Sequence, residues 1–142
     1  MAGWPQRCEP QAETLGIGER VDWHGIVRDP YHFYRTAHVF ALPSRVEGTP
    51  NALLEAMSCG LAVVVSDGAP GPLELIEDEI TGLIVPVNDP AKLAAAFRRL
   101  ATDRELRERL GAAARERVTE YNLPHALVTW ESVVGLTPCD QQ

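Results

Sequence analysis

The stretch that decides the fold of this chain reads EGTPNALLEAMSCG and covers residues 47–60. Gly48 and Pro50 mark a turn, and proline is accepted in the first turn of a helix because its missing N–H has no helical partner there. Residues 51–57 are predicted to continue as a helix, which Gly60 can close. The stretch is therefore a junction between a loop and a helix.

Two carboxylates, Glu47 and Glu55, stand eight positions apart in this junction. Glu47 belongs to the incoming loop, whereas Glu55 lies inside the helix, about 7–8 Å beyond Pro50 at a rise of ~1.5 Å per residue. The Glu55 side chain leans back toward the helix N-terminus. Both acids can therefore border one cleft above that N-terminus, where backbone N–H groups and the helix dipole favour a phosphate.

The order of the predicted elements indicates an α/β fold. Strands are expected at residues 21–26, 39–42, 62–66 and 83–87, and helices at about 29–36, 51–58 and 71–78. This alternation implies a Rossmann-like parallel sheet with flanking helices and right-handed crossovers. In such sheets ligands bind beyond the carboxyl ends of the strands, where the strand order reverses.

Helices alone are expected after the last predicted strand. Asp89 and Asp103 are placed to cap two of them, and a final helix contains Leu127, Trp130 and Val134. The fold therefore ends in a helical C-terminal extension.

Composition limits the classes of function. The 142 residues suit one domain, and 45% hydrophobic residues indicate a globular chain. A net charge of −7 argues against a nucleic-acid-binding surface. The three cysteines are scattered without metal-ligand spacing, which favours a reduced, cytoplasmic setting. No apolar run is long enough for a transmembrane helix, and residues 1–6 lack a signal-peptide core.

The junction resembles the Glu-seven-residues-Glu signature of retaining glycosyltransferases with the GT-B fold, above all those of family 4. Other segments resemble the family in the same order and at the same spacing: residues 20–27, 37–44, 60–67, 71–76 and 81–86. The similarity covers roughly residues 15–135. A lone pair of acids would be weak evidence, whereas this ordered set is specific.

The resemblance implies a site for a nucleotide-diphosphate sugar. Glu55 would bind the ribose, because a carboxylate accepts hydrogen bonds from both vicinal hydroxyls. Glu47 would face the transferred sugar, where it stabilises positive charge at the anomeric carbon or acts as a base. The other residues expected at the substrate are Ser44, Gly48, Thr49, Pro50, Asn51 and, beside the base, Val27. Three alternatives stay open: an ordinary helix glutamate at Glu55, a loop acid stabilised by the helix dipole at Glu47, and a core residue at Val27.

Relative to this family, residues 1–142 are expected to form a single partial domain, the C-terminal, donor-binding portion. Only about 20 residues precede Val21, whereas the family has two further strand–helix units there, and one crossover needs at least ~10–12 residues. The N-terminal acceptor domain is also expected to be missing. We therefore expect the chain alone to be inactive and to self-associate through its uncovered edge.

The sequence is thus interpreted as part of a retaining glycosyltransferase of the hexosyltransferase type. It would move a sugar from a nucleotide-diphosphate donor to a hydroxyl of a sugar or lipid-linked acceptor, in the cytoplasm or peripherally at the inner membrane face. No metal or other cofactor is expected, since the chain lacks an Asp-x-Asp triplet. The alternatives are a non-catalytic nucleotide-binding lobe that acts with a second polypeptide, and a GT-B sugar phosphorylase.

Overall fold

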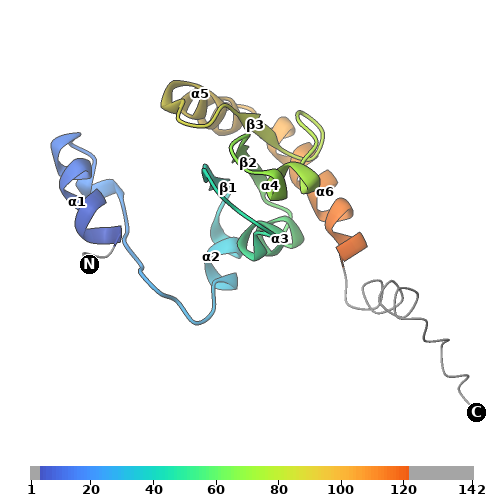
Figure 1. Cartoon of the computed structure of the whole chain (residues 1–142), viewed down its shortest axis with the longest axis horizontal. Helices are drawn as coiled ribbons and strands as arrows, with labels where there is room; N and C mark the ends of the chain where they lie inside the picture. The colour runs from blue at the N-terminus through green and yellow to red at the C-terminus, as the bar shows by residue number, and fades with distance from the viewer. Residues whose placement is uncertain (1–3, 122–142) are drawn as a thin grey trace, which may run out of the picture. The chain divides into compact units, whose positions relative to one another are not determined.

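The computed structural model describes residues 4–121, with side chains from Cys8 onward (Figure 1). The chain divides into two units between Pro30 and Tyr31. The first unit contains helix α1 (Trp4–Thr14) and the 3-10 turn η1 (Gly18–Arg20), and the second contains the sheet. The sequence shows no linker at this boundary, and the division was not predicted from it.

The strand predicted at residues 21–26 is wrong. The segment forms no strand, and every residue from Asp22 to Ile26 is exposed. Gly25 adopts a left-handed φ of 61°, which breaks an extended backbone. Trp23 is 43% exposed and Ile26 is 102% exposed, so the segment gains none of the apolar burial that favours a strand.

A three-stranded parallel sheet forms the centre of the second unit. Its strands are β1 (Val39–Leu42), β2 (Ala62–Ser66) and β3 (Leu83–Val85), in the spatial order β1-β2-β3. The predicted parallel α/β fold is therefore confirmed, and β1 and β2 have their predicted bounds. β3 ends two residues early because Pro86 has no N–H to donate to a neighbouring strand, and Val87 donates to the Asp67 carboxylate at 2.7 Å instead.

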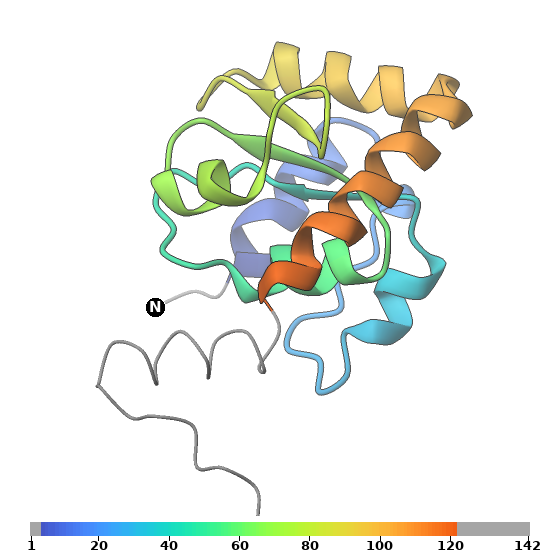
Figure 2. The same cartoon turned by 90° about the vertical axis from the view of Figure 1, so that its right-hand side faces the viewer.

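Helices flank this sheet in the second unit (Figures 1 and 2). They are α2 (Tyr31–Thr36), α3 (Asn51–Ser58), α4 (Pro70–Leu75), α5 (Pro90–Thr102) and α6 (Arg104–Val118), followed by the 3-10 turn η2 (Thr119–Tyr121). Asp89 and Asp103 cap α5 and α6 as predicted, and each carboxylate accepts a hydrogen bond at 2.9 Å from the backbone N–H three residues later. The predicted helix around Leu127, Trp130 and Val134 lies outside the described residues.

The central strand β2 is buried along its whole length. Ala62 and Val64 belong to a core that includes residues of α5 and α6. Val63 and Val65 belong to a second core, which includes residues of α3 and α4. Figure 1 shows the strands between α5 and α3. Because successive side chains of a strand point to opposite faces, a strand covered on both sides needs the continuous apolar run seen here.

Helix α4 ends at Leu75, earlier than the predicted end at residue 78, so residues 77–79 form a loop rather than a helix end. Ile76 is extended and only 4% exposed. Its side chain joins the core beside α3. The helix thus ends where an extended backbone lets the Ile76 side chain reach the core.

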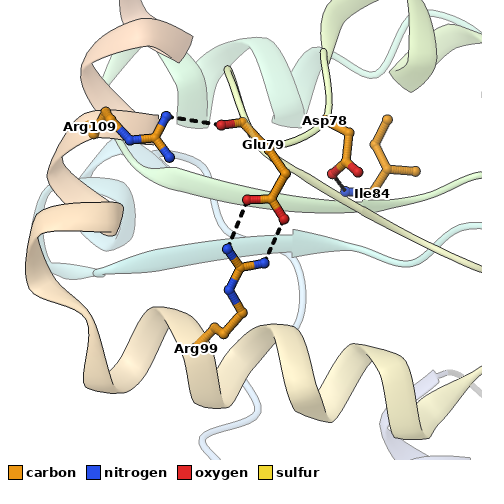
Figure 3. Close-up of polar contacts among 5 residues, drawn as sticks. All are labelled: Asp78, Glu79, Ile84, Arg99 and Arg109. Atoms are coloured by element: carbon orange, nitrogen blue, oxygen red, sulfur yellow. Dashed lines mark hydrogen bonds and ion pairs between the residues drawn. The ribbon is translucent and has the colours of Figure 1, made fainter.

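The loop that follows α4 is held by arginines from α5 and α6 (Figure 3). The Glu79 carboxylate accepts two hydrogen bonds from the Arg99 guanidinium, at 2.6 and 2.8 Å. Arg109 donates to the Glu79 carbonyl oxygen at 3.0 Å, and the Asp78 carboxylate accepts from the Ile84 N–H at 2.8 Å. These contacts fix the entry to β3, and the Arg99 hydrogen bond lowers the pKa of Glu79.

Candidate functional site

The loops after β1 and β2 meet at the carboxyl edge of the sheet. At the end of β2, the Ser66 hydroxyl donates to the Ser44 carbonyl oxygen at 2.5 Å. A methyl group added at Gly71, in the first turn of α4, would lie only 1.5 Å from the Gly48 carbonyl oxygen. The loop that carries Glu47 therefore packs directly against the start of α4.

A cavity of about 200 Å³ lies at this carboxyl edge. Residues of the loops after β1 and β3 line it, among them Arg45, Asn88 and Asp89. Neither Glu47 nor Glu55 lines it. The order of the described strands does not reverse, so the expected switch point is not seen in this part of the sheet. The placement of the candidate site rests on the carboxyl edge alone.

Glu47 lies half-buried in the loop between β1 and α3. Its Oε1 accepts a hydrogen bond from the Ser44 hydroxyl at 2.8 Å. Ser44, which was predicted to contact substrate, thus orients the Glu47 carboxylate.

Glu55 lies in the second turn of α3, where it is half-buried rather than fully exposed. Its Oε2 accepts a hydrogen bond from the Tyr34 hydroxyl at 3.1 Å. Burial, followed by the hydrogen bond to Glu55 and its charge, raises the pKa of Tyr34 to about 12. Tyr34 therefore remains a neutral donor at physiological pH. It holds one carboxylate oxygen, while Oε1 accepts no hydrogen bond from residues 8–121.

Sequence reasoning missed Tyr34. It precedes Glu55 by 21 positions and lies on a different helix, so no spacing rule links the two residues. The Tyr34 ring packs edge-on against Phe40 of β1, with 5.9 Å between ring centroids. The aromatic run at residues 31–34 is the one sequence signal that could have pointed to this helix.

The remaining predicted residues differ in exposure. Pro50 is buried and precedes α3, which begins at Asn51 as predicted, while Gly48, Thr49 and Asn51 are exposed. Val27 belongs to the first unit and is 37% exposed, so the alternative that it is a core residue is wrong. Glu47 and Glu55 have separate partners, and no hydrogen bond or shared partner joins them among the described residues.

A family of known proteins matches this chain over residues 1–117, and its description is Glycosyl transferases group 1. The chain belongs to this family. The fold agrees with that assignment, since the parallel sheet with flanking helices is part of a GT-B domain.

Several known proteins are related to this chain. An alpha-1,4-N-acetyl-D-galactosaminyltransferase of Campylobacter jejuni, which acts on an undecaprenol-linked saccharide, is 30% identical over 130 residues. That match covers 92% of this chain and 36% of the relative. A D-inositol 3-phosphate glycosyltransferase of Saccharomonospora viridis is 36% identical over 95 residues, covering 67% of this chain and 22% of that protein. The chain spans about a third of the length of the first curated relatives it matches.

Solved structures share the same fold. Sucrose-phosphate synthase of Thermosynechococcus elongatus superposes with a TM-score of 0.84 at 30% identity, over 92% of this chain and 33% of the synthase. HepE of Anabaena, in complex with UDP, gives a TM-score of 0.85 at 20% identity, over 94% of this chain and 37% of HepE. At 20% identity the likeness to HepE shows the fold alone.

Within the described part, no group of three or more His, Cys, Asp or Glu side chains is placed to hold a metal ion. No helix in that part has both the length and the apolar character needed to cross a bilayer.

We expect the raised pKa of Tyr34 to shape the alkaline stability of the chain. The unfolded tyrosine loses its proton near its ordinary pKa of 10.0, whereas the folded one keeps it to about 12. The stability that Tyr34 contributes is therefore present below about pH 10 and lost as the pH rises toward 12. Urea unfolding at a series of pH values should show a steeper loss for the unmodified chain than for Tyr34→Phe. Replacing the exposed Tyr121 by Phe serves as the control, and parallel curves for the chain and Tyr34→Phe would contradict the assignment.

Proposed function

We propose that this chain is the donor-binding part of a retaining glycosyltransferase. It binds a nucleotide-diphosphate sugar, whose hexosyl group passes to a hydroxyl of a sugar or lipid-linked acceptor. The observation that carries this proposal is the half-buried Glu55 carboxylate, one oxygen of which is held by Tyr34 at 3.1 Å. A carboxylate oriented in this way suits the two vicinal hydroxyls of a ribose.

The Glu47 carboxylate is assigned to the transferred sugar. Its loop packs against α4, and the Ser44 hydroxyl orients it at 2.8 Å. A fixed negative charge at this position stabilises the positive charge that develops at the anomeric carbon. Positioning and the stabilisation of the departing diphosphate supply the rest of catalysis, without a covalent protein intermediate.

The relatives support the class of donor and acceptor. HepE of Anabaena forms complexes with UDP and with UDP-glucose. The Campylobacter jejuni relative transfers N-acetylgalactosamine to a saccharide linked to undecaprenol by a diphosphate. A nucleotide sugar as donor and a saccharide or lipid-linked saccharide as acceptor are therefore proposed for the protein that contains this chain.

Removal of the Glu55 carboxylate tests the proposal. We expect Glu55→Ala to weaken binding of a nucleoside diphosphate by about 1.5–3 kcal/mol, or roughly 10–150-fold, because hydrogen bonds to a charged group are lost. Calorimetric titration with UDP, GDP and ADP measures this change and identifies the preferred base. Glu74→Ala, an exposed glutamate on α4, is the matched control. Equal affinities of Glu55→Ala and the unmodified chain would refute the ribose contact.

A further inference from the structure

A second cavity lies at the amino edge of the sheet, at the opposite end of the strands from the cavity that Arg45 and Asn88 line. Its volume is about 600 Å³, which falls within the range of ~300–1,000 Å³ typical of small-molecule sites. Its walls come from α2, the start of β2, the C-terminal end of α3 and the first turns of α6. All of the lining residues belong to the second unit.

The charged side chains that line this cavity are mostly basic. Arg35 comes from α2, Arg104 and Arg107 come from α6, and Glu108 is the one carboxylate among the lining residues. With His38 taken as neutral, three guanidinium groups and one carboxylate leave a formal charge of +2 at a cavity of a chain whose net charge is −7. This local excess of positive charge favours an anionic ligand.

The three guanidinium groups differ in how far other protein groups already bind them. Arg104 forms an ion pair with Glu108 at 2.6 Å, and both side chains are largely exposed. Arg107 donates from Nη1 to two carbonyl oxygens at the end of α5, at 2.5 and 3.2 Å. Arg35 has no hydrogen-bond or ion-pair partner among the described residues. Its donors are therefore available to a ligand without breaking a protein contact.

We propose that this cavity binds a small phosphomonoester, held chiefly by Arg35 with support from Arg104 and Arg107. The planar guanidinium fork matches the oxygens of a dianionic phosphate, and a dianion balances the charge of the cavity. The esterified group occupies the remaining volume, beside Tyr34 and Leu61. The cavity shares Tyr34 with the candidate donor site, but Arg35, Arg104 and Arg107 are not part of that site, and the proposal does not depend on the proposed function.

Calorimetric titration of the full chain with glycerol 2-phosphate tests the proposal. We expect one-to-one binding that weakens as salt is added. Arg35→Ala should weaken it by at least ~10-fold, because charge-assisted hydrogen bonds to phosphate oxygens are lost. Arg45→Ala is the matched control, since it removes an arginine at the opposite, carboxyl edge of the same sheet. This variant should bind the probe as the unmodified chain does.

A second variant should change the affinity in the opposite direction. Glu108→Gln removes the carboxylate from the cavity and frees Arg104, so binding should tighten by about 2–5-fold. A misfolded variant would not gain affinity, so this result separates the proposed contact from a loss of structure. The proposal is overturned by the absence of saturable binding, by a larger loss in Arg45→Ala than in Arg35→Ala, or by weaker binding in Glu108→Gln.

Discussion

Glu47→Gln is expected to lower the turnover of a complete glycosyltransferase that carries this segment by about 100-fold or more, the loss typical when one preorganised electrostatic group is removed. Glutamine keeps the size of the side chain and can still accept a hydrogen bond from the Ser44 hydroxyl, which lies 2.8 Å from the Glu47 carboxylate. The substitution therefore removes the negative charge while it preserves the loop. Because that charge would matter mostly in the transition state, the affinity for the nucleotide should stay within about twofold.

Steady-state kinetics and calorimetry of the same preparation separate these two effects. Ser44→Ala is the companion variant, since it removes the hydrogen bond that orients Glu47 but keeps the charge. We expect its turnover to lie between those of the unmodified enzyme and Glu47→Gln. If Glu47→Gln weakened nucleotide binding and left turnover unchanged, the carboxylate would act in donor binding instead.

Gly111→Ala is expected to destabilise the chain by about 3 kcal/mol, although alanine favours a helix over glycine by roughly 1 kcal/mol. Gly111 is buried in α6, and a methyl group there would lie 2.1 Å from the Gly60 carbonyl oxygen. Gly60 itself closes α3 with a φ of 77°. Two backbones therefore meet at this point, and neither has a flexible side chain that could move aside.

Denaturant unfolding measures this change in the free energy of unfolding. Gly48→Ala is the control, because a methyl group at Gly48 would meet no atom within 4 Å. We expect its stability to change by less than about 0.5 kcal/mol, as is usual for surface substitutions. A Gly111→Ala variant more stable than the unmodified chain would show that helix propensity outweighs the contact between α6 and Gly60.

Local signals in the sequence were sufficient to predict the bounds of several elements. Pro50 followed by Asn51 predicted the start of α3, and Asp89 and Asp103 predicted the starts of α5 and α6. Each of these signals acts within one turn of helix, so no distant residue is needed to satisfy it. The apolar run of β2 likewise predicted a strand covered on both faces, because such a strand needs apolar side chains at successive positions.

Sequence reasoning failed where a segment depends on a neighbour far along the chain. Residues 21–26 have a composition that permits a strand, yet a strand forms only when another strand pairs with it, and no described residue does so. Residues 77–79 lie in a loop because Ile76 is drawn into the core and Arg99 and Arg109 hold Glu79 from two other helices. Strand pairing decides the first outcome, and burial with long-range ion pairs decides the second, in both cases against local propensity.

The candidate site likewise depends partly on local sequence and partly on tertiary contacts. The sequence by itself determined which residue types stand at the loop-to-helix junction, with Glu47 before the helix and Glu55 inside it, because backbone geometry over eight positions is local. Only the tertiary structure decided that Tyr34 holds Glu55 and that Gly111 meets Gly60. These contacts join residues from separate helices, and their geometry follows from how the helices pack around the sheet, which no spacing in the chain records.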